Sequence, residues 1–231
     1  MSKIKNNIKE GFTLAEVLLT LVIVGIVAAL VIPSIIQTTQ NAQYKTAWKD
    51  SFSMLSQAHK RLLIDIGGST KGLCTEGDDN CLRNAYLPYL SYVKLCNNDK
   101  LYGNCWHNNS NFWFFNGAVA TWGNMSGIIL NNGMLMTFWY NSDAGAPGLA
   151  SQCTLQDPDG PALSCGQIYI DVNGFRKPNV LGRDIFTVHI METDIKPYGI
   201  SGDLPISTNC VDGSTAAGNY GHSCSARYLM Q

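Results

Sequence analysis

Charged side chains are scarce in this sequence. Asp, Glu, Lys and Arg make up 14% of the 231 residues, and the formal net charge is −1. Proteins that bind polyanions usually carry an excess of Lys and Arg, whereas this chain has 16 basic and 17 acidic residues. Nucleic acid is therefore not an expected partner. Glycine and asparagine are abundant instead, a composition that favours loop-rich β structure of the extracellular kind.

The sequence also lacks the motifs of the common enzyme classes. It contains no Walker, dinucleotide-binding or H-E-x-x-H pattern. No Ser–His–Asp or Cys–His spacing stands out around its four histidines. Catalytic triads need not be local in sequence, but nothing here supports an enzymatic function. We predict a protein with no catalytic residues and no cofactor.

One segment is almost free of charge. Between residues 12 and 36 the only charged side chain is Glu16, and three lysines precede the segment: Lys3, Lys5 and Lys9. A helix of this length, at about 1.5 Å per residue, can cross a hydrocarbon core of about 30 Å. The lysines predict a cytoplasmic N-terminus, with the rest of the chain across the membrane. No small-residue cleavage site follows the apolar run, so we do not expect an ordinary secretory signal.

Glu16 is the unusual residue of this segment. A carboxylate near hydrocarbon costs several kcal/mol unless it finds a partner. Two interpretations follow. Either the segment is a plain anchor with Glu16 at the level of the lipid headgroups, or Glu16 has a partner and a function.

The residues around Glu16 resemble a known signal. Gly11-Phe12-Thr13-Leu14-Ala15-Glu16, followed by the long apolar run, is similar to the class III signal of type IV pilins and type II secretion pseudopilins. In that family a prepilin peptidase cuts after the glycine and N-methylates the new terminus. The resemblance implies a leader at 1–11, cleavage between Gly11 and Phe12, and methylation of Phe12.

The resemblance also implies how the chain assembles. Glu16 corresponds to the glutamate that pairs with the terminal amine of a neighbouring subunit, which would supply the partner that its burial requires. Pro33 falls where many members carry a helix-kinking proline. A proline lacks the N–H and clashes with the preceding turn, so we expect a kink or a melted turn near Ala29–Pro33. The implied partners are identical or homologous pilin subunits, the prepilin peptidase, the inner-membrane assembly platform and the membrane itself.

The helical pattern continues beyond the apolar segment. Between residues 44 and 66 apolar side chains recur every three or four positions, with polar residues between them, and Gly67-Gly68 supplies a stop. We therefore predict one helix from about Thr13 to Ile66. Its first part, 12–36, is apolar on all sides, and its second part, 37–66, is amphipathic.

The remaining chain predicts a sheet. Strands are expected at 112–115, 118–122, 127–130, 134–140, 167–172 and 184–190, with an Asn-Gly turn at 131–133. The fold class is α+β and pilin-like, with an antiparallel sheet of about four strands from region 111–192 on the amphipathic helix. The globular domain is expected at 37–231, with a disulfide-bounded C-terminal region at 196–231.

All eight cysteines follow the apolar segment, on the side expected to be oxidising, so they predict disulfides. No C-x-x-C pattern is present and no histidine lies at ligand spacing, which makes zinc the weaker alternative. Many pairings are open to eight cysteines. We favour neighbours in sequence, because each such pair closes a short loop: Cys74–Cys81, Cys96–Cys105, Cys153–Cys165 and Cys210–Cys224.

Acidic residues offer a weak calcium hypothesis. Asp171, Asn173 and Asp184 flank a strand–loop–strand pattern that resembles many pilin-like domains, and some pseudopilins bind calcium in this region. Asx side chains more often cap turns locally, and that interpretation is favoured here. Another acidic stretch, with Glu76, Asp78 and Asp79, suits either contact with a cation or, as the favoured interpretation, a solvated acidic loop. The aromatic residues of 112–140 suit either a carbohydrate or peptide platform or, more often, a core.

These features favour a non-catalytic structural subunit of a type IV pilus or a related pseudopilus. Such a chain would cross the inner membrane once before assembly and lie in an extracellular or periplasmic filament afterwards. Two alternatives stay open. One is a minor pilin that acts as an adhesin for an extracellular ligand, and the other is a membrane-anchored extracytoplasmic protein that does not polymerise.

Overall fold

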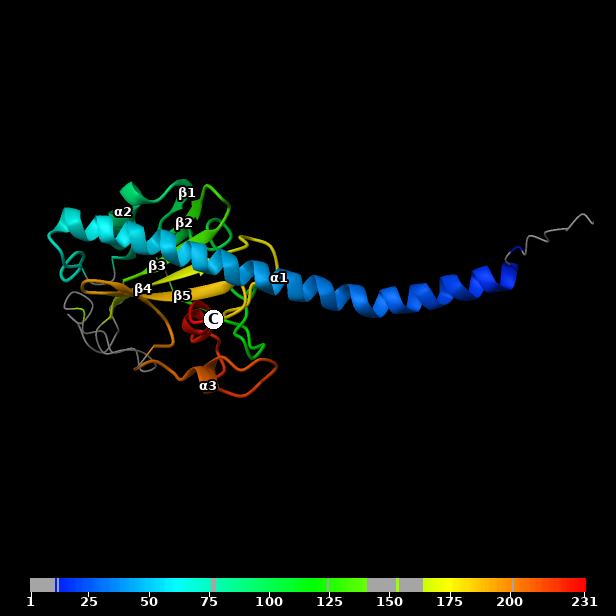
Figure 1. The fold of residues 1–231 in the computed structure, drawn as a ribbon. Coiled ribbons are helices and arrows are strands. Elements are labelled where there is room, and N and C mark those ends of the chain that lie inside the picture. The colour runs from blue at the N-terminus through cyan, green and yellow to red at the C-terminus, as the bar shows by residue number, and fades with distance from the viewer. Residues whose placement is uncertain are drawn as a thin grey trace, which may run out of the picture. The chain divides into compact units, whose positions relative to one another are not determined.

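The computed structural model describes residues 11, 13–75, 78–123, 125–140, 153, 164–200 and 202–231. The chain forms two compact units, Met1–Ala42 and Gln43–Gln231. The first unit contributes the N-terminal part of helix α1 (Leu14–Ile66), and the second contains the rest of α1 and the sheet (Figure 1).

Helix α1 has the bounds that the sequence predicts. It ends at Ile66, where Gly67 and Gly68 adopt φ values of 90° and 94° and the Gly68 N–H donates to the Leu63 carbonyl at 2.7 Å. The buried residues of α1 all come from its second part and recur at three- and four-residue spacing: Trp48, Ser51, Leu55, Ala58, His59 and Leu62. This single stripe confirms the amphipathic character of that part.

The sheet is antiparallel throughout, and each strand pairs with the next along the chain. Its order is β1 (Tyr92–Cys96), β2 (Ser126–Leu130), β3 (Leu135–Trp139), β4 (Ser164–Asp171), β5 (Ile185–Met191) and β6 (Ile195–Pro197). The sheet therefore has six strands where about four were expected. The predicted turn between β2 and β3 is present, with Gly133 at φ 86° and its N–H bonded to the Leu130 carbonyl at 2.9 Å.

The prediction of strands at 112–115 and 118–122 is wrong. Trp113 forms isolated bridges with Val119 and Val180 but belongs to no strand of the sheet. The aromatic run is instead folded inward: Phe112 is fully buried, and its ring lies 4.6 Å from that of Trp122 between centroids. Burial of these rings in a loop has replaced strand pairing.

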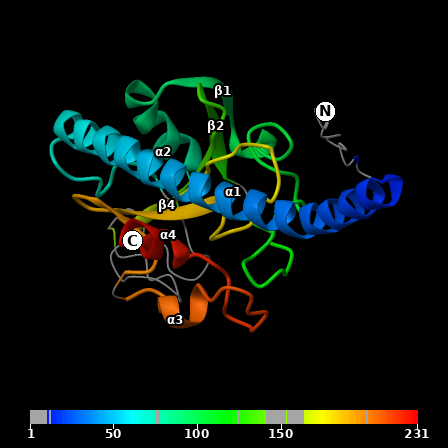
Figure 2. The same ribbon diagram turned by 45° about the vertical axis from the view of Figure 1, so that its right-hand side comes forward.

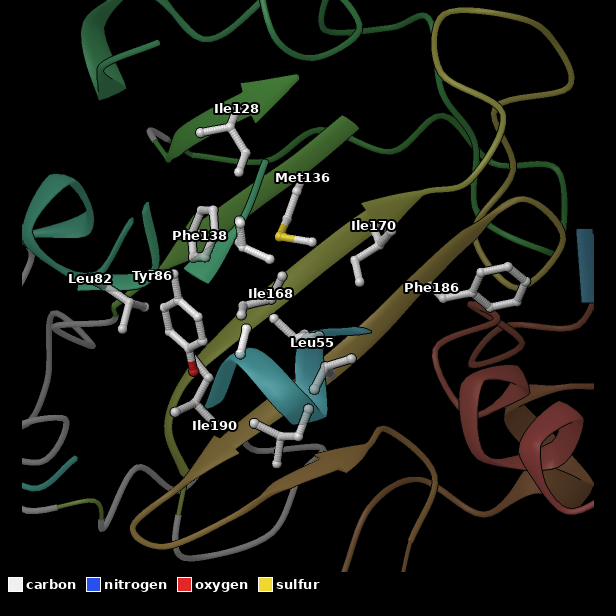
Figure 3. Packing of buried hydrophobic residues seen from close by; sticks show 14 of the residues in the cluster. Leu55, Leu82, Tyr86, Ile128, Met136, Phe138, Ile168, Ile170, Phe186 and Ile190 are labelled. Carbon is white, nitrogen blue, oxygen red and sulfur yellow. The ribbon is translucent and has the colours of Figure 1, made fainter. Parts of the chain in front are cut away.

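The second part of α1 packs on one face of the sheet (Figures 1 and 2). Leu55 is fully buried and faces apolar side chains of the central strands, including Ile168 and Ile190 (Figure 3). Trp48 stacks on Phe186 at 4.8 Å between centroids. The predicted packing of the amphipathic helix on the sheet is confirmed. The short helices α2 (Asp79–Tyr86) and η1 (Leu87–Tyr89) add Leu82 and Tyr86 to this core.

The opposite face of the sheet carries a second core. Residues alternate along β3, so Met136 and Phe138 face the first core while Leu135 belongs to the second. The chain around η2 (Asn98–Lys100) and after it covers this face with Trp106 and Phe112. The C-terminal segment holds the remaining helices, α3 (Ile206–Asn209) and α4 (Cys224–Leu229).

Four disulfides close short loops of the second unit. They join Cys74 to Cys81, Cys96 to Cys105, Cys153 to Cys165 and Cys210 to Cys224. This is the pairing of sequence neighbours that we favoured, and no cysteine is free. A disulfide stabilises a fold mainly because it limits the freedom of the unfolded chain.

Candidate processing and assembly site

The start of α1 is built as a capping box. The carboxylate oxygen Oε2 of Glu16 accepts hydrogen bonds from the Thr13 N–H at 2.8 Å and from the Thr13 hydroxyl at 2.7 Å. The Glu16 N–H in turn donates to the Thr13 hydroxyl at 3.2 Å. Helix starts leave N–H groups without intrahelical partners, and this reciprocal arrangement satisfies two of them.

The capping box gives Glu16 a role that our sequence reasoning missed. The signal was present, because Thr-x-x-Glu directly before an apolar run is the usual pattern of a capping box. A negative charge in the first turn is also favoured by the helix dipole. Both hydrogen bonds to the carboxylate end on Oε2. In the single chain, Glu16 is therefore already oriented at the helix start.

Gly11 precedes this turn and is exposed. Among the described residues, no atom lies within 4 Å of the position that a Cβ on Gly11 would occupy. Phe12, the expected site of methylation, and the leader residues 1–10 lie outside the described residues.

The part of α1 between residues 17 and 36 is apolar on all sides. Its large side chains are exposed, from 43% for Val17 to 74% for Leu30. By length and composition α1 is able to cross a membrane, and it is the one helix in the described part of the chain that meets this test. A surface of this kind is stable in hydrocarbon or against the same surface of other chains.

A comparison with known families decides what this segment is. The family model described as "Prokaryotic N-terminal methylation motif" matches residues 6–32. The chain carries the N-terminal signal of a type IV pilin-like prepilin. Comparison with curated proteins and with solved structures gave no match.

The prepilin signal implies processing by a prepilin peptidase and assembly with other pilin subunits. Together with the apolar helix, it supports anchoring in the inner membrane before assembly. A pilin-type motif also suggests a structural rather than an enzymatic protein. The match covers the N-terminal signal alone, so these statements rest on that segment.

Pro33 lies inside α1, and the helix continues through it. The turn at Ala29–Pro33 is therefore not melted, although Pro33 has no N–H to donate to the carbonyl four residues earlier. A kink at this position stays a prediction.

The weak calcium candidates hold local turns. Asp171, at the end of β4, accepts the Asn173 N–H at 3.0 Å, and Asp184 accepts the N–H groups of Asn179 at 2.8 Å and Val180 at 2.7 Å. These are the Asx caps that the sequence interpretation favoured. In the part of the chain that the structure describes, no group of three or more His, Cys, Asp or Glu side chains is placed to hold a metal ion.

The same carboxylates are buried beside a histidine. His107 Nε2 lies 2.7 Å from Asp171 Oδ2. Burial lowers the pKa of His107 to about 4 and raises the pKa of Asp171 well above its usual value. Burial, with the nearby Asp171, also raises the pKa of Asp184 to about 7. Burial thus disfavours the charged forms of all three side chains.

The interpretation of the acidic stretch as a solvated loop is wrong for Asp79. This residue is only 5% exposed, so it does not belong to a solvated acidic loop. Its carboxylate accepts the Tyr140 N–H at 2.6 Å and its carbonyl accepts the Ser126 hydroxyl at 2.6 Å, so it ties α2 to the sheet. Burial raises the pKa of Asp79 to about 7. The sequence does not show that Asp79 is buried. The adjacent Asp78 is also an aspartate, yet it is a solvent-exposed helix cap.

Proposed function

We propose that this protein is a structural subunit of a type IV pilus or a related pseudopilus. The observation that carries the proposal is the methylation motif at 6–32 joined to a helix whose apolar surface is exposed on every side. In this proposal the peptidase removes residues 1–11 and methylates Phe12. Helix segment 12–36 then leaves the membrane for the filament core, and domain 37–231 lies outside the inner membrane, in the periplasm or at the cell surface.

Glu16 would guide this step through its charge. The amine created by cleavage is positive, and in hydrocarbon both it and the Glu16 carboxylate are costly unless they pair. The capping box supports this role, because it fixes the carboxylate at the start of the helix and leaves Oε1 outside the two hydrogen bonds. A neighbouring subunit's amine would then complete the site.

Substitution of Glu16 by Gln tests the proposal. Glutamine preserves the capping box, because its side-chain oxygen accepts the same hydrogen bonds, but it removes the charge. We expect processing and membrane insertion to persist and the amount of subunit in sheared filaments to fall at least tenfold. Immunoblots of membrane and sheared fractions would measure both.

Thr13→Ala is the matched control, since it weakens the cap and keeps the charge. We expect it to retain most of the incorporation. Normal incorporation of the Glu16→Gln variant would contradict the proposal and favour an anchored protein that does not polymerise.

A further inference from the structure

An aromatic cavity lies on the sheet face that does not contact α1. Its volume is about 270 Å³. The strands supply its floor, with Trp139 from β3 and Tyr169 from β4. Both side chains point to the same face of the sheet as Leu135, which belongs to the second core. Every residue that lines the cavity belongs to the second unit.

Two irregular segments form the walls. Phe114 and Trp122 come from the chain before β2, and Tyr198, Tyr220 and His222 come from the C-terminal segment. Several aromatic side chains at the opening are only partly buried, among them Trp122, Trp139 and Tyr220. The cavity is therefore open to solvent at these three side chains, whereas Tyr169 and Tyr198 are buried.

The walls are fixed by hydrogen bonds and a disulfide. The Tyr102 hydroxyl lies 2.7 Å from the Trp122 carbonyl and 2.6 Å from that of Gly123. The Phe115 N–H donates to the Tyr220 carbonyl at 3.0 Å, which joins the two walls directly. The Cys210–Cys224 bridge closes the C-terminal segment around Tyr220. Such a site needs little ordering when a ligand binds, which favours affinity.

The rings are held in close contact with one another. Trp122 and Tyr169 lie 4.2 Å apart between centroids, and Tyr198 and His222 lie 4.9 Å apart. The Tyr169 hydroxyl donates to Gln167 at 2.7 Å, and His222 Nδ1 lies 3.1 Å from the Thr187 hydroxyl. Polar groups of the sheet thus hold the inner rings in place.

The lining is aromatic but also polar at its edges. Every described residue that lines the cavity except Phe114 has a hydroxyl, an indole N–H or an imidazole nitrogen on its ring. Burial lowers the pKa of His222 to about 3, so its imidazole is neutral at physiological pH. The described lining therefore carries no charge at that pH. It offers flat apolar faces together with neutral hydrogen-bonding groups.

This combination selects among ligand classes. A cation is attracted to aromatic faces, but this lining has no carboxylate to offset the cost of removing a cation from water. The Trp122 and Trp139 indole N–H groups and the Tyr220 hydroxyl supply hydrogen-bonding groups that a purely apolar ligand could not use. A neutral pyranose ring matches both features, since it has an apolar C–H face for the rings and hydroxyls around its rim.

We propose that this cavity binds a neutral carbohydrate residue, stacked on the aromatic side chains and hydrogen-bonded to their polar edges. The proposal goes beyond the assembly function, because none of the residues that it uses belongs to the N-terminal signal. It assigns a ligand to a subunit whose assembly would be governed elsewhere in the chain.

Full-length protein should be tested on an array of neutral and charged oligosaccharides. The detergent must have neither a sugar nor a choline headgroup, and a polyoxyethylene ether meets this requirement. We expect binding to neutral glycans, with a change in tryptophan fluorescence when a bound glycan is titrated into the solution. Absence of binding to any neutral glycan would overturn the proposal, as would tighter binding of choline than of the best glycan.

Variants then locate the binding site. Trp139→Ala and Tyr220→Ala should each weaken glycan binding about tenfold or more, because each removes one stacking ring. Tyr92→Ala is the matched control, because Tyr92 is 42% exposed on β1 and does not line the cavity. Thermal unfolding shows which variants remain folded, and Trp139→Phe, which keeps a ring, should retain more binding than Trp139→Ala. Equal binding by the folded cavity variants and by wild type would overturn the proposal.

Discussion

Glu16 and Asp79 are both acidic residues in the first turn of a helix, and their surroundings give them different roles. Glu16 is exposed and caps the helix that carries it. Asp79 is buried and holds the backbone of Tyr140, far along the chain. The first is available to a partner from another subunit. The second affects the stability of the folded domain, and it does so in a pH-dependent way.

Asp79→Asn should make folding less sensitive to pH. Because the folded-state pKa of Asp79 is raised to about 7, its ionisation opposes folding, and stability is lost as pH rises from about 4 to 7. Asparagine keeps an oxygen that can accept the Tyr140 N–H but has no charge. We expect the variant to gain on the order of 2 kcal/mol relative to wild type between pH 5 and pH 8, measured by denaturant unfolding at both values.

Asp78→Asn is the control for this effect. Asp78 is an exposed helix cap whose carboxylate accepts the Cys81 N–H at 2.8 Å, and asparagine serves equally well at such a position. This variant should follow the wild type at both pH values. A parallel pH dependence of Asp79→Asn and wild type would show that the buried carboxylate does not oppose folding.

At the scale of elements, the buried stripe of α1 organises the globular domain. Leu55→Asp would place a charge where the side chain is fully buried against the sheet. An unpaired buried charge costs several kcal/mol, so we expect loss of the cooperative thermal transition in near-ultraviolet circular dichroism. Ile64→Asp, on the same helix but 79% exposed, should unfold close to the wild-type temperature. A folded Leu55→Asp variant would contradict this packing.

Periodicity was a good guide where burial is one-sided or complete. It located α1 and strands β2 to β5, because their apolar side chains repeat at helical spacing or form dense runs between turn residues. It missed β1, whose exposed residues include Val93 at 69%, and the three-residue β6. The aromatic run at 112–122 was wrongly predicted to form strands, because the sequence alone does not show that rings such as Phe112 are buried within a loop.

The functional residues were predictable to a similar degree. Glu16 and Gly11 stand in a motif that is local in sequence, and local motifs can be found without a structure. The capping box was equally local, through Thr13 and Glu16, but it was overlooked. The aromatic residues of 112–140 were weighed as a carbohydrate or peptide platform, with a core preferred. The cavity itself could not have been predicted, because the folded sheet brings its strand floor together with walls from two distant segments.

At the scale of the whole molecule, the chain joins an assembly signal to a disulfide-fastened domain. The apolar part of α1 needs hydrocarbon or other subunits, whereas the second unit buries its own two cores. Four bridges in this unit suit an oxidising compartment. We therefore expect the residues before Phe12 to stay in the cytoplasm and the cysteines to cross the membrane.

The intact mass of the protein purified from its native membrane or filaments, with mapping of its N-terminus, tests this account most directly. We predict a chain that begins at N-methyl-Phe12 and has lost eight hydrogen atoms, two for each of the four disulfides. A chain that still begins at Met1 would contradict the account, because the Gly11–Phe12 signal would then be unused and the segment would be a plain anchor.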